Sequence, residues 1–315
     1  MNKPNRIQAG LLCMGVAINL TAQEYTTAPG ASNKIVPPTA EWIAKITALA
    51  PAKATTQPTA PRRILLFSLA TGYKHEVIPH ASEVVKVLGT KSGAYEVIES
   101  NDIEMLAPDK LKTFDAVVLN NTCPKREYRD MFMDVLADRP EAERNKRAAE
   151  LEQSLLDFVR NGKGLVALHG AIAVQNNSPE FSEMMGGSFD FHPKRQSVTL
   201  NLVDPAHPLV AGFHDKGFIH SDEPYLFKNA YAKKNFRPLL EMNVGKLDEQ
   251  TRKNPKVTGE TRYVAWIKGY GKGRVFYCGP SHQPESYETA VLLQFILDGI
   301  QYALGDLPCD DSPIQ

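Results

Sequence analysis

The sequence predicts an α/β fold built on a doubly wound, mostly parallel sheet. Short apolar runs bounded by turn residues alternate with segments of helical period, which is the pattern of βαβ units. The later apolar runs are less regular, and residues 197–203 alternate apolar with polar side chains. We therefore expect early strands buried on both faces and antiparallel additions in the second half of the chain.

Each element follows from its local pattern. The run Ile64-Leu65-Leu66-Phe67 is typical of a central parallel strand, and a charged helix is expected where Leu151, Leu155 and Phe158 share one side. The first half should hold strands at 64–67, 95–98, 115–119 and 164–168, with helices near 77–88 and 142–160. The second half should hold strands at 197–203, 218–219, 238–242, 263–267 and 273–278, a polar inserted loop at 246–261, and a closing helix over 291–304.

The N-terminus resembles a secretory signal. Lys3 and Arg6 precede an apolar run from Ile7 to Leu20, and Ala22 follows. This run is too short to span a membrane. We expect residues 1–22 to be a signal peptide of a periplasmic protein, the alternative being an apolar helix that stays attached. The remaining chain should divide into a Pro/Thr/Ala-rich arm at 23–61 with a short helical piece near 40–50, one domain at 62–305, and a C-terminal tail at 306–315.

Composition excludes several kinds of partner. Lysine plus arginine equals aspartate plus glutamate at 36 each, so no basic excess indicates nucleic acid and no charged block indicates a membrane surface. The cysteines beyond the signal, Cys123, Cys278 and Cys309, match no zinc or redox spacing, and an odd number argues against a disulfide framework. The oligomeric state stays open, and a homo-oligomer is compatible with the sequence.

Polar residues follow several expected strands. Residues 164–171 read as a buried strand that breaks at a small-residue turn and presents His169. His75 follows the first strand, His282 follows the last, and Asn120 with Asn121 ends the third. Because the carboxyl ends of parallel strands share one edge, these side chains can converge on a site. The alternative for any one histidine is a hydrogen-bonded loop residue.

Two further groups combine imidazole with carboxylate or aromatic side chains. Asp222 and Glu223 lie just after His220, and this pairing suits either a divalent metal or acid/base chemistry, the alternative being a solvated turn. His192 lies between Phe191 and Pro193 and either lines a pocket or packs in a loop. Glu285 follows His282 closely, and a carboxylate beside an imidazole fixes its tautomer.

These residues together resemble the ThuA-like family of trehalose-utilisation proteins, which have a class I glutamine amidotransferase-like fold. The match covers about residues 62–305 and implies a flavodoxin-like domain with a role in carbohydrate catabolism. It does not imply a glutaminase, because His169 stands where those amidotransferases carry a catalytic cysteine, while His282 and Glu285 resemble the partner pair. The resemblance rests on Gly72-Tyr73-Lys74-His75, Leu168-His169-Gly170-Ala171, His192-Pro193, Asp222-Glu223-Pro224-Tyr225, Trp266 and Gly271-Lys272-Gly273-Arg274-Val275-Phe276 followed by His282.

The resemblance also implies a substrate class and a cofactor. Members are associated with trehalose, related disaccharides and their 3-keto forms, and some are thought to bind zinc. The zinc ligand candidates are His169, His192 and His282, with Glu223 or His75 as alternatives. The expected catalytic residues are Glu223, His282, His75 and Asp222. The expected substrate-binding residues are Tyr73, Asn120, Asn121, Phe191, Tyr225 and Glu285.

Three functions remain in competition at this point. The first is an exported enzyme, with zinc as its candidate cofactor, that hydrolyses or isomerises a trehalose-like disaccharide, a glycoside or a 3-keto sugar. The second is a non-catalytic sugar-binding module, and the third is a scaffold that retains a degraded pocket. Sugar platforms use exposed aromatic side chains, for which the candidates are Tyr73, Phe189, Phe191, Tyr225 and Trp266.

Overall fold

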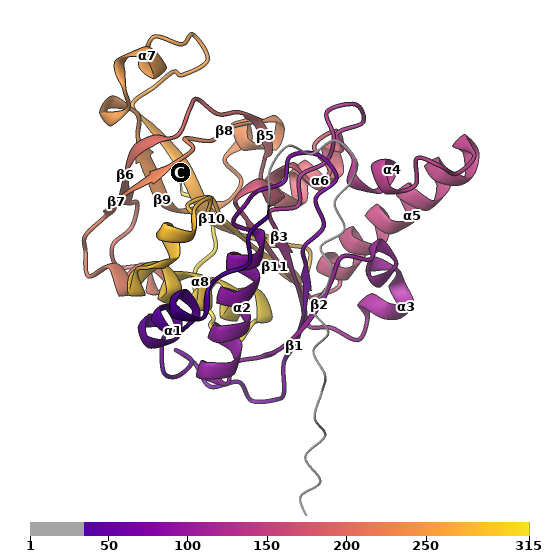
Figure 1. The fold of residues 1–315 in the computed structure, drawn as a ribbon, viewed down its shortest axis with the longest axis horizontal. Helices are drawn as coiled ribbons and strands as arrows, with labels where there is room; N and C mark the ends of the chain where they lie inside the picture. Colours follow the sequence, from indigo (N-terminus) through magenta and orange to yellow (C-terminus); the bar gives the residue numbers. More distant parts are fainter. Residues whose placement is uncertain (1–34, 315) are drawn as a thin grey trace, which may run out of the picture.

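The computed structural model describes residues 35–314. The expected signal peptide at 1–22 and the first part of the expected arm lie outside the described residues. The described chain folds around one large sheet flanked by helices (Figure 1). No helix within residues 35–314 combines the length and the apolar character needed to cross a membrane.

The parallel half of the sheet carries the expected strands. Its order, β2-β1-β3-β4-β11, is that of flavodoxin-like folds, in which ligands bind beyond the carboxyl ends of the strands. The predicted fold class is therefore confirmed. The bounds are Glu96–Ser100 for β2, Arg63–Phe67 for β1, Ala116–Asn120 for β3, Gly164–Leu168 for β4 and Gly273–Cys278 for β11.

The antiparallel half extends the same sheet beyond β11. Its strands are β10 (Thr261–Tyr270), β9 (Arg237–Asn243), β6 (Gln196–Leu202) and β7 (Phe218–Asp222), in that order. A separate two-stranded sheet pairs β5 (Ser188–Phe191) with β8 (Leu226–Lys228). The sequence pattern did not predict this small sheet, because both strands are too short to show a period.

Helices cover both faces of the parallel strands. On one face lie α2 (Ile78–Ser92) and α8 (Ala290–Leu304), and on the other lie α5 (Glu141–Arg160) and α6 (Pro179–Met185) (Figure 1). Shorter elements complete the connections: α3 (Pro108–Leu111), α4 (Met131–Val135), α7 (Glu249–Arg252), η1 (Ile103–Leu106), η2 (His169–Ala173), η3 (Pro208–Phe213), η4 (Asn229–Lys233), η5 (Val244–Lys246) and η6 (Pro284–Tyr287).

Two apolar cores follow from the alternation of side chains along the strands. In β1, Ile64 and Leu66 face α2 and α8, whereas Leu65 and Phe67 face α5, and all four are fully buried. Burial on both faces explains why these strands read as continuous apolar runs. The two packed layers fix the positions of the loops at the carboxyl edge of the sheet.

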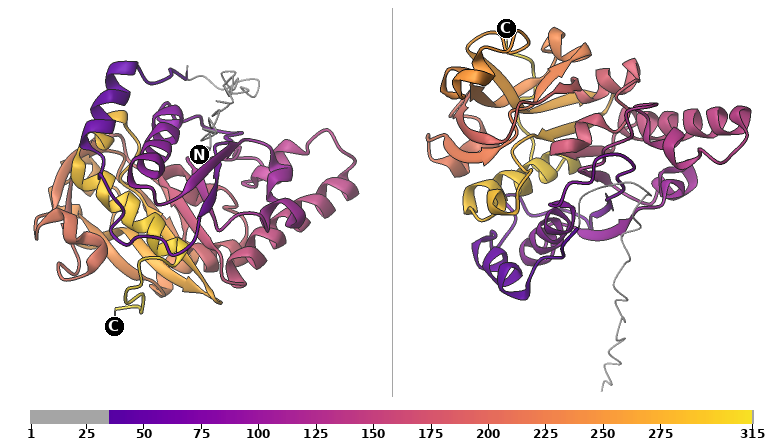
Figure 2. Two further views of the ribbon diagram at one scale, coloured as in Figure 1. Left: turned by 90° about the horizontal axis from the view of Figure 1, so that it is seen from below. Right: turned by 45° about the horizontal axis from the view of Figure 1, so that its top comes forward.

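The arm before β1 packs against the domain from α1 (Ala40–Leu49) onward. Thr39 caps this helix by accepting a hydrogen bond from the Trp42 amide, and Ile46 is fully buried. Further along, Thr55 donates its hydroxyl to Asp298 of α8. Figure 2 shows the arm running beside α8. The proposed domain boundaries themselves stay a prediction.

Candidate metal centre

Four parallel strands deliver polar residues to one edge of the sheet. β1 leads to His75, β3 ends at Asn120, β4 leads directly to His169, and β11 leads to His282. His75, His169 and His282 meet there, although they are far apart in sequence. The fourth member, Glu223, follows the antiparallel strand β7 at the far end of the sheet.

The turn after β4 is conformationally demanding. His169 adopts a left-handed backbone with φ of 44°, which is uncommon for a residue other than glycine and costs about 1–3 kcal/mol. A Cβ atom on the next residue, Gly170, would lie 2.4 Å from Cε1 of His75. Glycine at this position therefore lets the His75 ring approach His169, and the strained elbow places the His169 ring at the strand end.

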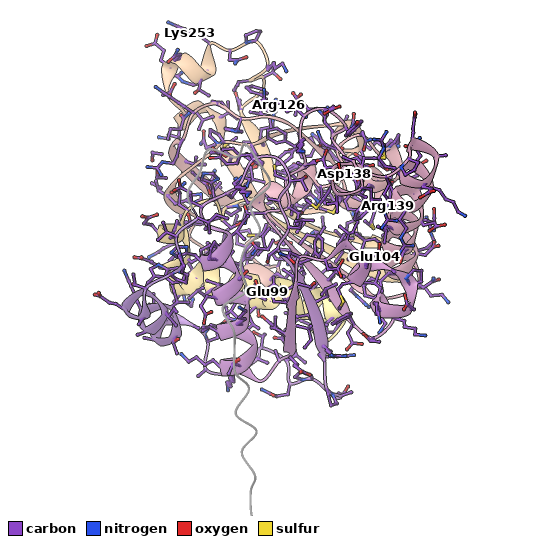
Figure 3. The ribbon with its side chains drawn as sticks, turned by 45° about the vertical axis from the view of Figure 1, so that its right-hand side comes forward. Glu99, Glu104, Arg126, Asp138, Arg139 and Lys253 are labelled. Carbon is purple, nitrogen blue, oxygen red and sulfur yellow. The ribbon has the colours of Figure 1, made fainter. Side chains whose placement is uncertain are left out.

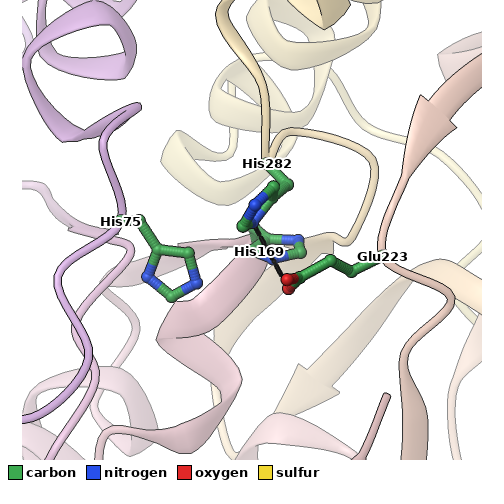
Figure 4. A group of neighbouring side chains, drawn as sticks. All are labelled: His75, His169, Glu223 and His282. Atoms are coloured by element: carbon green, nitrogen blue, oxygen red, sulfur yellow. Dashed lines mark hydrogen bonds and ion pairs between the residues drawn. The ribbon is translucent and has the colours of Figure 1, made fainter. Parts of the chain in front are cut away.

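The donor cluster comprises His75, His169, Glu223 and His282, each of which offers one ligand atom within 4.8 Å of the others. Nε2 of His169 lies 3.0 Å from Nδ1 of His282. Oε2 of Glu223 lies 3.5 Å from that Nε2 and 3.4 Å from that Nδ1. Figure 4 shows His75 and Glu223 approaching the two central rings from opposite sides.

These three separations fit the donor spacing of a zinc site. Two ligand atoms at about 2.0–2.1 Å from one tetrahedral zinc ion lie about 3.3–3.4 Å apart. The observed values of 3.0, 3.5 and 3.4 Å bracket that figure. The residues present therefore fit a divalent metal.

The tautomer of His169 is suited to metal binding. Its Nδ1 lies 2.8 Å from the carbonyl oxygen of Gly279. Since a carbonyl oxygen only accepts, Nδ1 carries a proton. In the neutral ring Nε2 can then accept the hydrogen bond from Nδ1 of His282 or bind a metal. A backbone carbonyl that orients an imidazole in this way is a recurrent support for metal ligands.

Burial keeps the other imidazoles neutral. It lowers the pKa of His75 well below the usual value, and the neighbouring His169 and His282 lower it further. Burial, followed by His169, lowers the pKa of His282 to about 3. Burial alone would raise the pKa of Glu223, but the contact with His169 and the nearby imidazoles of His282 and His192 give a net lowering. Neutral imidazoles and an ionised carboxylate are the protonation states that metal ligands require.

Asp222 lies behind the donor cluster rather than within it. Its Oδ1 accepts the backbone N–H of Glu223 at 2.7 Å, and its Oδ2 lies 3.5 Å from Nδ1 of His220. Burial raises the pKa of Asp222 to about 7. In this position the carboxyl group orients the backbone that carries Glu223, although the sequence predicted a catalytic role.

A cavity of about 720 Å³ opens in front of the donor cluster. This volume lies in the range of small-molecule sites. His75 and Glu223 reach its wall, and the buried Tyr225 directs its hydroxyl to Nε2 of His75 at 3.4 Å. The other lining residues are Thr71, Gly72, Tyr73, Lys74, Cys123, Pro124, Lys125, Arg126, Arg129, Ala173, Asn176, Phe189, Asp190, Phe191 and His192.

His192 lines the cavity but lies outside the donor cluster. Its Nε2 is 3.6 Å from Oε2 of Glu223, and its ring stacks on Tyr225 at 5.4 Å. Nδ1 lies 2.9 Å from the carbonyl oxygen of Pro193, so Nδ1 is the protonated nitrogen and Nε2 can accept a proton. The structure thus favours the two alternatives, His75 and Glu223, over His192 as members of the ligand set.

Three other expected site residues do not line the cavity. The amide of Asn120 is fully buried and donates to Ser68, Ser82 and the Ile78 carbonyl, so it anchors α2. Asn121 donates to Asn120, and neither residue lines the cavity. Glu285 is exposed on η6, and the carboxylate beside His282 is that of Glu223. Glu285 is therefore close to His282 in sequence, but the carboxylate that contacts His282 is a different one.

The expected aromatic platform is partly formed. Tyr73, Phe189, Phe191 and Tyr225 line the cavity, and Tyr73 is half exposed at its mouth. Trp266 is fully buried in β10 and donates to the Met185 carbonyl, so it is a core residue. It therefore cannot contact a ligand from this position.

Sequence reasoning missed the loop after β3. Cys123, Lys125, Arg126 and Arg129 all line the cavity. Burial and then Glu223 raise the pKa of the Cys123 thiol to about 12, so it stays protonated at neutral pH. The rule that sites form beyond the carboxyl ends of strands could have identified this loop, because it follows β3 directly.

Comparisons with known proteins agree with this architecture. The chain is similar to a ThuA-like protein from Bacteroides uniformis (17% identity, TM-score 0.57, 80% of this chain and 94% of that one). It is also similar to a ThuA-like protein from Parabacteroides merdae (19% identity, TM-score 0.56, 78% and 90%). These likenesses show the fold alone. No curated protein sequence matches the chain. The sequence model of the ThuA family, described as trehalose utilisation, matches residues 63–303, and the chain therefore belongs to that family.

Proposed function

We propose that the protein is a zinc-dependent enzyme that hydrolyses or isomerises a trehalose-like disaccharide, a glycoside or a 3-keto sugar. The observation that carries this proposal is the spacing of Nε2 of His169, Nδ1 of His282 and Oε2 of Glu223, at 3.0, 3.4 and 3.5 Å. These three potential ligand atoms come from three separate elements and converge beside a cavity of the size that holds a small molecule.

His75, His169, Glu223 and His282 would hold the metal. A metal there would polarise a sugar oxygen as a Lewis acid. The chain's own residues supply the remaining functions. Tyr225, whose pKa burial raises well above 10, keeps its hydroxyl proton and remains a hydrogen-bond donor at the inner end of the cavity. Tyr73 and Phe191 offer apolar faces to a sugar ring.

His192 is the group we assign to proton transfer. Glu223 was the expected base, but its Oε2 is committed to the two central imidazoles. Nε2 of His192 is accessible from the cavity and has the lone pair free. In hydrolysis it takes the proton of the attacking water and returns it to the leaving oxygen as the glycosidic bond breaks. In isomerisation it takes the proton from the hydroxyl-bearing carbon beside the keto group and returns it to the former keto carbon, while the proton of that hydroxyl moves to the keto oxygen.

The first test is metal content of the purified full-length protein beside two variants. His169→Ala removes a central donor, and His214→Ala removes an exposed histidine that does not line the cavity, as a matched control. We expect about one zinc per chain in the wild type and in His214→Ala, and a loss of at least tenfold in His169→Ala. Turnover of disaccharides and 3-keto sugars should follow the metal content.

Absence of metal in the wild type, even after zinc is supplied, would refute the zinc mechanism. Sugar affinity that survives both chelation and His169→Ala would then assign the chain to sugar-binding modules, for which the aromatic lining of the cavity is suited. A metal-loaded protein without turnover on any sugar would refute the proposed reactions while leaving the metal centre in place.

We further propose that the protein is exported to the periplasm, on the strength of the basic and apolar pattern at residues 1–22. Cell fractionation with N-terminal sequencing tests this proposal. A mature chain beginning near Gln23 in the periplasmic fraction is expected. A chain that retains Met1 in the cytoplasm would contradict it.

A further inference from the structure

The wall of the cavity formed by the loop after β3 is basic. Lys125, Arg126 and Arg129 lie within seven residues of Cys123 and all line the cavity. Lys74 joins them from the loop after β1. Among the described residues, the side chains of Lys125, Arg126 and Arg129 form no ion pair, in contrast to many surface cations of this protein. Their charge is therefore available to a ligand.

The loop that carries these cations is held in place. Oδ2 of the buried Asp134 accepts both the backbone N–H of Lys125 and the hydroxyl of Thr71, each at 2.6 Å. The Cys123 carbonyl accepts the N–H groups of Thr71 and Gly72. A Cβ on Gly72 would lie 2.1 Å from the Pro124 carbonyl oxygen, so the two loops pack backbone to backbone. Because the backbone of this loop is already ordered, binding of a ligand has only the side chains to order.

Arg129 is fixed most firmly. Its backbone is left-handed with φ of 52°, its N–H donates to the Lys125 carbonyl, and its carbonyl accepts the N–H of Asn177. These bonds tie the loop to the segment after η2, which lines the same cavity through Asn176. A non-glycine residue held at positive φ marks a backbone that its surroundings determine. The backbone of Arg129 is thereby held at the cavity wall, from which its side chain extends.

The acids at the cavity do not balance this charge. Oδ1 of Asp190 lies 3.7 Å from Nζ of Lys256, and this cation offsets the negative charge of Asp190. Glu223 is engaged with His169, His192 and His282. Glu127 is exposed and does not line the cavity. The loop at 125–129 thus faces the cavity with an excess of positive charge, although the whole chain is neutral.

We infer that the substrate is an anionic sugar, whose carboxylate or phosphate group is held by Lys125, Arg126 and Arg129 while its reacting carbon faces the donor cluster. The inference rests on the proposed function, because it assigns the substrate class of the same cavity. Guanidinium groups bind both anions through paired N–H donors, and such charge-assisted bonds are about twice as strong as neutral ones. A neutral disaccharide would leave this wall without a partner.

The test compares three sugars that differ only at C6: methyl α-glucoside, methyl α-glucuronide and methyl α-glucoside 6-phosphate. Binding to the metal-loaded full-length protein is measured by calorimetry at low and at high salt. At least one anionic sugar should bind about tenfold or more tightly than the neutral one, and 0.5 M salt should reduce that advantage severalfold. Preference for the glucuronide would identify a carboxylate site, and preference for the phosphate would identify a phosphate site.

Arg129→Gln, Lys125→Gln and Arg126→Gln should each reduce the advantage of the anionic sugar without changing affinity for the neutral one. Lys125 and Arg126 are exposed, so these two variants test the idea even where Arg129→Gln is unstable. Arg139→Gln is the matched control, because Arg139 is exposed and lies away from Arg126 (Figure 3). It should leave all three affinities unchanged.

Equal binding of the three sugars, or an anionic advantage that Arg129→Gln and Lys125→Gln both leave intact, would overturn the inference. If the protein nevertheless contains zinc, such a result would leave the proposed function unchanged. Anionic preference in a protein that holds no metal would support the substrate class and refute the zinc mechanism instead. The two ideas therefore fail separately.

Discussion

Two polar clusters of this protein, each with buried members, make an instructive pair. The arm cluster, formed by Thr55, Gln294, Asp298 and Gln301, lies where the N-terminal arm meets α8. Its bonds close on themselves: Thr55 and Gln294 both donate to Asp298, and Gln301 accepts from the Thr55 amide. The donor cluster at the sheet edge is different, because its three imidazoles and one carboxylate place their potential ligand atoms within 4.8 Å of one another, beside a cavity.

The contrast separates polar burial that stabilises from polar burial that awaits a ligand. A buried group that is fully hydrogen-bonded adds about 0.5–1.5 kcal/mol per bond, whereas an unpaired one costs about 1–3 kcal/mol. The hydrogen bonds of the arm cluster are of the first kind, although burial of the Asp298 charge opposes them at neutral pH. In the donor cluster the potential ligand atoms face one another, and the proposed metal would bind between them. Changes in the two clusters should therefore affect different properties.

The largest effect is expected from Glu223→Gln. The amide keeps the shape of the side chain but removes the negative charge shared with His169 and His282. We expect kcat/KM to fall by about a thousandfold or more, together with most of the bound zinc. Steady-state kinetics and metal analysis measure both. Glu285→Gln, at an exposed acid nearby in sequence, should change neither. Full activity in Glu223→Gln would show that the site does not need this carboxylate.

Ile46→Ala addresses the arm instead. Ile46 is fully buried between α1 and the domain, so truncation should cost about 2–4 kcal/mol of unfolding free energy. Zinc content and kcat should stay at wild-type values. Denaturant unfolding gives the stability, with Val36→Ala at a half-exposed position as the control. A loss of zinc in Ile46→Ala would show that the two regions are coupled.

Gly170→Ala tests the elbow that brings two donors together. The new Cβ would lie 2.4 Å from Cε1 of His75, so that ring must move. Zinc affinity should drop about 10- to 100-fold, the size of effect seen when groups that position metal ligands are altered. A competition assay with a chelator measures the affinity. Unchanged affinity would remove His75 from the ligand set.

The smallest effect is expected from Asp298→Asn and depends on pH. Burial raises the pKa of Asp298 to about 6, while hydrogen bonds from Thr55 and Gln294 oppose the shift. Since the folded pKa lies above the unfolded value, this group lowers the stability of the wild type as pH rises from about 4 to about 6. The asparagine variant escapes this loss and should be about 1–2 kcal/mol more stable at pH 7, with little difference at pH 4. Urea unfolding of both proteins at pH 4 and pH 7 measures the difference in stability. A variant less stable than the wild type at pH 7 would contradict the prediction.

The sequence predicted the parallel core well because strands buried on both faces read as uninterrupted apolar runs. Ile64–Phe67 and Gly164–Leu168 are examples, and the rule about strand ends then placed His75, His169 and His282 on one edge. Their functional roles stay predictions. The small β5–β8 sheet was missed because its strands carry too few residues for a period to show.

The remaining parts of the site depend on contacts that no local pattern contains. Glu223 reaches the cluster from an antiparallel strand, so sequence reasoning could not rank it above His192 as a ligand. Asn120 ends the expected strand, yet its side chain turns toward α2. The cations at 125–129 look like ordinary surface residues until the loop after β1 is seen to pack against them.

The scatter of the four donors along the chain has a consequence for the cell. They span residues 75 to 282, so the centre cannot exist on a growing polypeptide until almost all of it has left the ribosome. The proposed ion must therefore be acquired after folding, from whatever pool surrounds the finished protein. Because imidazole and carboxylate donors bind several first-row metals in an order set by the metals themselves, that pool decides which one is loaded. The compartment in which folding ends would thus help to decide which metal the protein carries.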